Sequence, residues 1–401
     1  MTEALIEPVV FNPYDYHFHD DPYPTYSRLR HEAPIYHNVD VGFWALSRYS
    51  DVLSAFKDNK RLSSANGVSL DPAAYGPHAH YVMSFLAMDD PRHMRLRQLV
   101  SRGFTPRRVA ELDSRILELT TAHLTPALAT GEFDWISEVA GKLPMDVISE
   151  LMGVPEPDRA ELRRNADLVV HREDGVLDVP PAAVEASISL MNYYKDMIAE
   201  RRRTPTDDLT SALLDAEIDG DKLSDAEILG FMFLMVVAGN ETTTKLLGNA
   251  LYWGSHNRSE IAAVLRDPDL SAEWVDETLR YDTSSQIVAR TTTVDLEYYG
   301  TTVPAGEKML LLIGSANRDP EVFDDADAFR LGRNSVNKLA SFGAGVHFCL
   351  GAHLARLEAK IALAEFARHV RDYEVDEAGI ERVHSTNVRG FAALPVKVQV
   401  R

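Results

Sequence analysis

Apolar residues recur at helical spacing through the middle of the chain, over residues 91–265. Leu112, Ile116 and Leu119, for example, are separated by steps of three and four and share one helix face. Proline-containing breaks divide this region and leave an uninterrupted pattern over residues 181–203. We therefore predict a bundle of helices, one of which spans residues 181–203.

The longest predicted helix covers residues 224–253. Ser224 followed three residues later by Glu227 forms a capping box, which satisfies free amides at a helix start. The uncharged stretch inside it, residues 228–240, is shorter than the ~20 apolar residues that a membrane span needs. We expect a buried core helix and no membrane span.

Strand-like segments lie on both sides of the helical region. Residues 43–46, 291–294 and 309–313 are rich in β-branched, aromatic or aliphatic side chains. A last helix is predicted over residues 350–370. With no internal repeat or linker, the pattern predicts one domain over residues 1–401, mainly α with minor β (α+β, with a small β-sheet region).

Composition narrows the function classes. Lys and Arg total 41 and Asp and Glu total 61, which gives a formal net charge of −20. Such an acidic chain repels phosphates, so we expect no nucleic-acid partner. A single cysteine allows no internal disulfide, and residues 1–20 lack the basic start and apolar core of a signal peptide. We expect a cytoplasmic protein.

The strongest chemical signal surrounds the single cysteine, in residues 342–351. Gly343 and Gly345 predict a tight loop, and Cys349 stands where the predicted helix begins. Free amides and the helix dipole stabilise a thiolate there, and a thiolate is the form that ligates metals. A lone cysteine is more often a buried structural residue, but a structural cysteine needs no such glycine loop.

This segment resembles the haem-binding signature of the cytochrome P-450 superfamily, F-G-x-G-x-H-x-C-x-G, at every fixed position. The resemblance runs the length of the chain and points to soluble bacterial members of the actinobacterial or mycobacterial type. It implies haem b (iron protoporphyrin IX) with Cys349 as the iron ligand, and a monooxygenase that activates dioxygen. It also implies that the loop contacts haem through Phe342, Gly343, His347 and Gly351.

A second motif, residues 238–243, lies inside the longest predicted helix. Small residues at Ala238 and Gly239 allow close approach to the backbone, and an acid next to a hydroxyl, Glu241–Thr242, can relay protons through water. The resemblance assigns Glu241 and Thr242 to proton delivery and Ala238 to the haem contact. In isolation the motif also fits a glycine kink with a hydroxyl bonded to its own helix.

Further residues take roles only from the resemblance. Glu277 and Arg280, three apart on one helix face, match an E-x-x-R pair that a later arginine completes; Arg333 fits best and Arg330 less well. The haem propionates require cationic or hydrogen-bonding partners. The resemblance supplies them as His93, Arg97, Arg290 and His347, although Asp90 replaces the first proline of the motif D-P-P-x-H-x-x-x-R.

The substrate pocket is expected to be apolar. Such a wall suits a hydrophobic small molecule, for example a lipid, steroid or terpenoid, although apolar positions are more often plain core. The acidic and basic residues at 171–174 precede a predicted helix break and are interpreted as part of a lid over the entrance. The predicted pocket residues are Val68, Phe85, Val237, Ile287, Val288 and Phe391.

Electrons must come from outside the chain, because no dinucleotide-binding fingerprint is present. The resemblance implies a ferredoxin and a ferredoxin reductase as donors, and the protein is expected to act as a monomer. A basic patch suited to an acidic ferredoxin is one interpretation of scattered arginines, and ordinary solvated side chains are the other. These arginines are Arg92, Arg95, Arg102, Arg107, Arg108 and Arg356.

The sequence leaves three alternatives open. The first keeps the haem thiolate but uses peroxide or rearranges its substrate, and the second is a haem-binding sensor without catalysis. The third is a cysteine hydrolase with Cys349 as nucleophile, which predicts a colourless protein.

Overall fold

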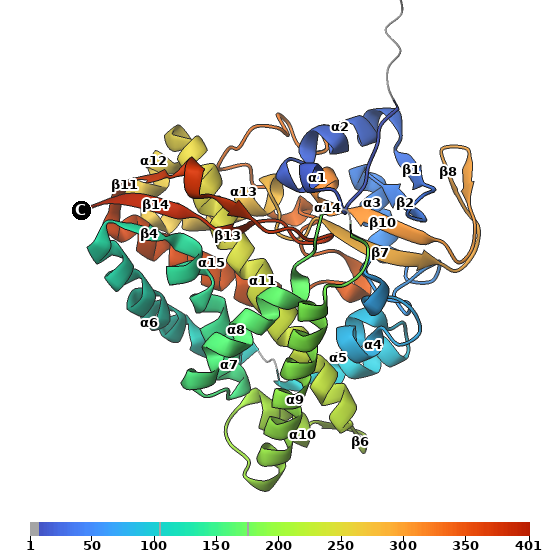
Figure 1. Cartoon of the computed structure of the whole chain (residues 1–401), viewed down its shortest axis with the longest axis horizontal. Coiled ribbons are helices and arrows are strands. Elements are labelled where there is room, and N and C mark those ends of the chain that lie inside the picture. Colours follow the sequence, from blue (N-terminus) through green and yellow to red (C-terminus); the bar gives the residue numbers. More distant parts are fainter. Residues whose placement is uncertain (1–7, 104–105, 175) are drawn as a thin grey trace, which may run out of the picture.

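The computed structural model describes residues 8–103, 106–174 and 176–401. Helix α11, Asp225–His256, runs through the centre of the molecule (Figure 1). Its start is fixed by the predicted capping box, in which the Glu227 amide donates to Ser224 Oγ and the Ser224 amide donates to Glu227 Oε2 at 2.9 Å. Eighteen of its residues are buried, so α11 is the common packing surface for the surrounding helices.

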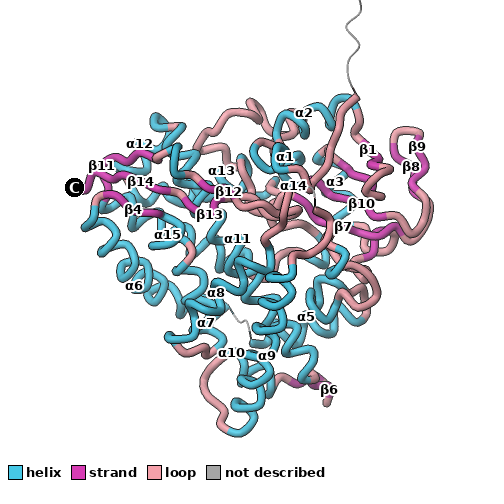
Figure 2. Tube along the Cα trace, in the orientation of Figure 1, coloured by secondary structure: helices cyan, strands magenta, loops and turns pink. Residues whose placement is uncertain are grey.

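Helices dominate the half of the molecule that surrounds α11, as the cyan segments of Figure 2 show. Two apolar clusters form between them, one around Trp135 and Trp274 and the other around Phe231 and Tyr194. These helices are α5 (Arg92–Gly103), α6 (Pro106–Thr130), α7 (Lys142–Met152), α8 (Glu156–Val170), α9 (Pro181–Arg203), α10 (Leu209–Asp215), α12 (Arg258–Arg266), α13 (Ser271–Tyr281) and α15 (Ala352–His369).

The largest sheet has five strands in the order β1-β2-β10-β7-β3 and combines distant parts of the chain. Strand β2 pairs in parallel with β10, so that Ala45 lies opposite Leu310, whereas β10 and β7 are antiparallel. The strands are β1 (Ile35–Asn38), β2 (Phe43–Leu46), β3 (Leu62–Ser63), β7 (Ile287–Thr292) and β10 (Lys308–Leu312). Short helices α1 (Tyr16–Asp20), α2 (Tyr23–Glu32) and α3 (Tyr49–Lys57) accompany this sheet.

A second sheet, β11-β14-β4, lies near the C-terminus (Figure 1). It joins β4 (Glu132–Asp134) to β11 (Val370–Val375) and β14 (Pro395–Val400). In the described part of the chain, three two-stranded ribbons complete the β structure: β5 (Glu217–Ile218) with β6 (Asp221–Lys222), β8 (Leu296–Tyr298) with β9 (Thr301–Val303), and β12 (Glu381–Arg382) with β13 (Phe391–Ala393). The short helices α4 (His80–Met83) and α14 (Ile313–Ala316) are the remaining α elements.

The predicted helix-rich fold with a small β region is confirmed. Several boundaries differ by one to four residues. Strand β7 begins at Ile287, four residues earlier than expected, because Ile287–Ala289 pair with the apolar end of β10. Helix α15 begins at Ala352, two residues later than expected. Among the described residues, every helix is too short or too polar to cross a bilayer.

Candidate active site

A large cavity lies between the middle of α11, the start of α15 and strand β7. The empty space inside its wall, including the part open to solvent, is about 1470 Å³. Helix α11 contributes Leu234, Met235, Ala238, Gly239, Thr242, Thr243 and Leu246 to the wall.

The cysteine loop, residues 342–351, forms one side of this cavity. Gly343 and Gly345 both have left-handed backbones, with φ of 66° and 70°, and a Cβ on Gly345 would lie 2.9 Å from the Phe56 carbonyl oxygen of α3. The Cys349 amide donates to the Phe342 carbonyl at 3.0 Å, which closes the loop. Cys349 is exposed, and its accessible surface faces the cavity.

The sulfur of Cys349 receives hydrogen bonds from the backbone amides of Gly351 and Ala352, at the start of α15. Although its surface is open to the cavity, the protein atoms around Cys349 raise the pKa of its thiol, because they displace much of the water that would stabilise a thiolate. Arg97 and Arg356 act in the opposite direction without reversing it. A free thiolate is therefore disfavoured here, and a cation bound directly to the sulfur would compensate for the lost hydration.

Positive and hydrogen-bonding groups gather on the same wall. Arg97, Arg290 and His347 line the cavity, and the ring of His93 lies 4.1 Å from that of His347. Several of their nitrogens are buried without a hydrogen-bond partner: both ring nitrogens of His93, Nη1 of Arg97 and Nδ1 of His347. The Nδ1 atom of His93 is 3.5 Å from Asp90 Oδ1. Unsatisfied buried donors of this kind are rare and point to an absent anionic partner.

The pKa values of these groups also indicate an anionic partner. Burial, together with the charges of Arg290, His93 and Arg97, lowers the pKa of His347 to about 3. Burial also lowers the pKa of Arg290 to about 10, and Asp89 only partly opposes this. Two arginines with little compensating charge, next to two neutral histidines with unpaired ring nitrogens, fit the two propionates of haem. The cavity-facing sulfur fits the haem iron. The residues present therefore fit a haem group.

Helix α11 presents the two residues of the predicted proton relay in different directions. Thr242 lies on the cavity wall, and its hydroxyl donates to the Ala238 carbonyl at 2.8 Å. Glu241 is fully buried outside the wall, where Lys245 Nζ lies 3.1 Å from Glu241 Oε2. Residues one apart on a helix differ by about 100° in direction, which separates the acid from the hydroxyl.

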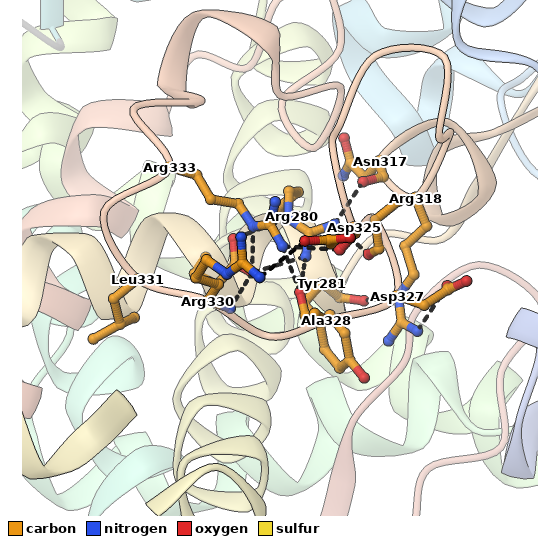
Figure 3. Close-up of polar contacts among 12 residues, drawn as sticks. Arg280, Tyr281, Asn317, Arg318, Asp325, Asp327, Ala328, Arg330, Leu331 and Arg333 are labelled. Atoms are coloured by element: carbon orange, nitrogen blue, oxygen red, sulfur yellow. Dashed lines mark hydrogen bonds and ion pairs between the residues drawn. The ribbon is translucent and has the colours of Figure 1, made fainter. Parts of the chain in front are cut away.

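The structure brings together Glu277, Arg280 and Arg333, the three residues assigned to the ion network. Figure 3 shows the two arginines near each other. Glu277 Oε1 lies 2.7 Å from Arg280 Nη2 and 3.1 Å from Arg333 Nε. Arg280 is completely buried and also donates to the Ala326 carbonyl at 2.7 Å. Arg330 contributes its backbone amide to Glu277, whereas its exposed side chain pairs with Asp325. The network fixes α13 to the long segment that precedes the cysteine loop.

Three of the six predicted pocket residues lie on the cavity wall: Val68, Phe85 and Val288. The expectation for Val237, Ile287 and Phe391 is corrected. Val237 precedes the wall residue Ala238 on α11, so its side chain points in another direction and packs against the apolar cluster around Phe231. Ile287 points to the face of β7 opposite to Val288 and packs in the core. Phe391 is fully buried in the core, against Tyr252.

Other residues of the cavity wall were not predicted from the sequence. Pro144 and Ile148 of α7, Ser284, Ser285 and the buried Glu358 of α15 also line the cavity. Glu358 stands nine residues after Cys349 within a regular helical pattern, and no local motif distinguishes it from other acids. Burial alone raises its pKa to about 8, and its Oε2 has no hydrogen-bond partner.

The structure describes the side chains of three of the six arginines that were interpreted as a basic patch. Arg92 is exposed, but Arg95 binds Asp221 and Glu227, and Arg356 binds Asp276. The side chains of Arg102, Arg107 and Arg108 lie outside the described residues. The charges of Arg95 and Arg356 are therefore largely compensated within the chain.

Comparisons with known proteins agree with this geometry. The Cytochrome P450 family model matches residues 182–400. The chain is 61% identical over 402 residues to a Mycobacterium tuberculosis protein named as cytochrome P450 123, with all of both chains covered. It is 36% identical to the vitamin D(3) 25-hydroxylase of Pseudonocardia autotrophica, covering 96% of this chain and 95% of the relative. The structure of CYP109E1 from Bacillus megaterium in complex with corticosterone matches with a TM-score of 0.83 and 30% identity, covering 95% and 99% of the two chains.

Proposed function

Because the chain belongs to the cytochrome P450 family and is a haem-thiolate monooxygenase, we propose that it hydroxylates a hydrophobic small molecule with electrons from a ferredoxin and its reductase. The observation that carries the substrate class is the apolar wall contributed by α11, α7 and residues 68–86, on the cavity that Cys349 faces. A lipid, a steroid or a terpenoid would bury its surface against this wall.

Haem b, when bound, supplies the activation of dioxygen and the transfer of one oxygen atom. In this proposal Cys349 ligates the iron, and the Gly351 and Ala352 amides orient the sulfur. Arg97, Arg290, His93 and His347 hold the propionates, whose charge would occupy the unpaired donors described above. Ala238, Phe342, Gly343 and Gly351 would pack against the macrocycle.

Proton supply falls to the two neighbouring residues of α11. The Thr242 hydroxyl lies on the wall and holds a proton at Oγ1, which it donates to the Ala238 carbonyl in the resting geometry. Glu241 is the neighbouring acid on the helix. Because its side chain points away from the cavity, it would resupply that proton through intervening water. Leu234, Met235 and the other apolar wall residues limit the water that reaches the substrate.

The electron donors and the cellular location are inferred from chemistry. The sequence carries no dinucleotide fingerprint of its own, so a separate reductase chain is required in this proposal. Two exposed apolar side chains of the cysteine loop, Val346 and Phe348, together with the exposed Arg92, would offer a mixed apolar and basic contact for an acidic ferredoxin. We place the reaction in the cytoplasm, where the single cysteine stays reduced.

The first experiment tests the iron–sulfur bond. Purified protein, reduced and treated with carbon monoxide, is expected to give the long-wavelength Soret maximum of a thiolate-ligated haem. Cys349→Ala is expected to lose that maximum, because no other cysteine is present in the chain. A variant spectrum identical to that of the unmodified protein would contradict the assignment.

The second experiment tests the substrate class. A library of lipids, steroids, terpenoids and matched polar compounds is titrated against the protein, and the Soret shift reports displacement of iron-bound water. Hits are incubated with a surrogate ferredoxin, its reductase and dioxygen, and the products are identified by mass spectrometry. We expect hydroxylated products from the apolar hits. Binding confined to polar compounds, or binding without oxidation across the library, would contradict the proposal.

A further inference from the structure

A cluster of three titratable side chains connects α8 to α11, next to the cavity but outside its wall. Asp167 of α8 and Glu241 of α11 hydrogen-bond to each other through their carboxyl groups. Lys245 Nζ lies 3.1 Å from Glu241 Oε2 on the next helical turn. Two carboxyl groups can share such a hydrogen bond only when one of them carries a proton.

The two acids differ in their access to water. Glu241 and Lys245 are almost completely buried, and Lys245 is tightly covered by Gly390, where a Cβ would lie 2.6 Å from the Lys245 Cβ. Asp167 is exposed, although the surrounding protein removes much of its hydration. Asp167 is therefore the member of the cluster that water reaches.

The charges around the pair determine which acid holds the proton. The partial loss of hydration and the neighbouring Glu241 raise the pKa of Asp167, and Lys245 and Arg163 oppose this only partly. The pKa of Glu241 is lowered despite its burial, because Lys245 and Arg163 favour its ionised form and Asp167 donates a hydrogen bond to it. The amide of Asn240, 3.4 Å from Glu241 Oε1, also favours the ionised form. These are the charged and polar groups described around the pair on α8 and α11.

We propose that Asp167 is a proton donor for Glu241, so that α8 carries the step by which solvent protons reach the monooxygenase site. In this step the O–H bond of the Asp167 carboxyl breaks and an O–H bond forms on Glu241, which leaves the negative charge on Asp167. Water then returns a proton to Asp167 from the solvent side. This inference rests on the proposed role of Glu241 and extends it to a second helix.

The location on α8 gives the proposal a structural consequence. The same helix ends at Val170, and the next residues form the connection that we interpret as a lid. Arg172 in this connection binds Asp71 with paired hydrogen bonds of 2.9 and 2.6 Å. Any displacement of α8 that accompanies opening of the lid would separate Asp167 from Glu241 and interrupt proton supply.

The main test locates the proton without using catalysis. Infrared difference spectra of the haem-loaded protein are recorded against pH for the unmodified chain, Asp167→Asn and the control Glu161→Gln, which removes an exposed acid of the same helix. We expect a protonated-carboxyl band, additional to the band of the buried Glu358, that disappears in Asp167→Asn, persists in Glu161→Gln and titrates well above the ~4 of an ordinary aspartate. A spectrum that is unchanged in Asp167→Asn, or a band with an ordinary midpoint, would overturn the proposal.

Glu241→Gln provides the second variant, in case Asp167→Asn fails to fold. Removing the neighbouring charge should lower the midpoint of the Asp167 band by at least one pH unit, and an unchanged midpoint would overturn the shared proton.

With a hit from the ligand screen, Asp167→Asn should raise the hydrogen peroxide released per oxygen consumed several-fold and shift the alkaline limb of the pH profile of the oxidation rate. Unchanged peroxide release and an unchanged profile would overturn the donor role. Failure of the monooxygenase proposal would show instead as a missing thiolate Soret band, and the infrared result would still decide the position of the proton.

Discussion

At the scale of single residues, Gly345 shows how strongly the cysteine loop constrains its sequence. The residue combines a left-handed φ of 70° with a backbone carbonyl 2.9 Å from the position of a Cβ. Substitution therefore requires both a strained backbone and a displacement of α3. Either requirement alone would be enough to shift the loop that holds Cys349.

Gly345→Ala is accordingly expected to destabilise the protein and to lower its haem content. The matched control is Gly42→Ala, which has a φ of 77° but nothing within 4 Å of the added Cβ. The control isolates the backbone cost, of order 1–3 kcal/mol, and Gly345→Ala should exceed it. Urea unfolding and the ratio of Soret to protein absorbance measure both effects. Equal losses in the two variants would show that the contact with Phe56 is unimportant.

Glu358 predicts a dependence of stability on pH. Its pKa is raised from 4.5 to about 8 by burial, so the folded protein holds a proton that the unfolded chain loses above pH 4.5. Stability from this group is fully present below pH 4.5 and falls as pH rises toward about 8, at up to about 1.4 kcal/mol per unit.

Glu358→Gln removes the titrating group, so the fall in unfolding free energy between pH 5.5 and pH 8 should become smaller. Urea unfolding at both pH values measures it, with Glu381→Gln, an exposed acid, as the control. An equal fall in unfolding free energy between pH 5.5 and pH 8 in Glu358→Gln and Glu381→Gln would contradict the protonation of Glu358.

At the scale of elements, the ion network decides how α13 is attached to the segment before the cysteine loop. Arg280→Ala would leave the buried Glu277 with only Arg333 as a charged partner, at an expected cost of about 3–5 kcal/mol. Arg330→Ala removes an exposed pair with Asp325 and should cost no more than about 1 kcal/mol. Thermal and urea unfolding compare the two variants. Similar losses would show that burial does not distinguish these arginines.

The elements themselves were largely predictable from the sequence. The boundaries of α9 coincide with the predicted 181–203, because prolines and a polar break mark both ends, and the capping box identified the start of α11. The cysteine loop carries its own glycines and was equally visible. The direction of individual side chains was harder to predict. Val288 faces the cavity and Ile287 the core, although both are apolar β-branched residues of one strand.

What the sequence could not provide was contact between distant segments. Nothing near Asp167 indicates that it meets Glu241, 74 residues later, because the pairing depends on how α8 crosses α11. The same holds for Phe391, whose burial against α11 follows from the return of the C-terminal strands to the core. Local patterns predict elements, whereas long-range packing determines which of their residues form the site.

At the scale of the whole molecule, the connection between α8 and α9 is tied to three separate segments. Arg172 pairs with Asp71, its amide donates to the His384 carbonyl at 2.9 Å, and its own carbonyl accepts from the Tyr16 hydroxyl at 2.9 Å. Figure 1 shows this connection extending from the helical region toward α1. Asp71 lies three residues after Val68 of the cavity wall, so the contacts hold the lid residues close to the cavity.

Breaking this attachment should accelerate ligand exchange. We expect Arg172→Met, combined with Asp71→Asn to avoid an unpaired buried charge, to increase the association and dissociation rates of imidazole several-fold. Stopped-flow absorbance at the Soret band measures both rates. Arg164→Met, at an exposed position of α8, is the control. Rates equal to those of the control would mean that these contacts do not limit access.

The parallel pairing of β2 with β10 also bears on how the protein is made. Residues 43–46 leave the ribosome about 260 residues before their partner, so one edge of β2 stays unpaired during most of translation. Such a long sequence separation slows folding and leaves an aggregation-prone strand edge exposed in the nascent chain. Folding of the N-terminal segment therefore depends on completion of the C-terminal half. Chaperone supply during expression should change the yield of folded protein, whereas it should leave the free energy of unfolding of the finished fold unchanged.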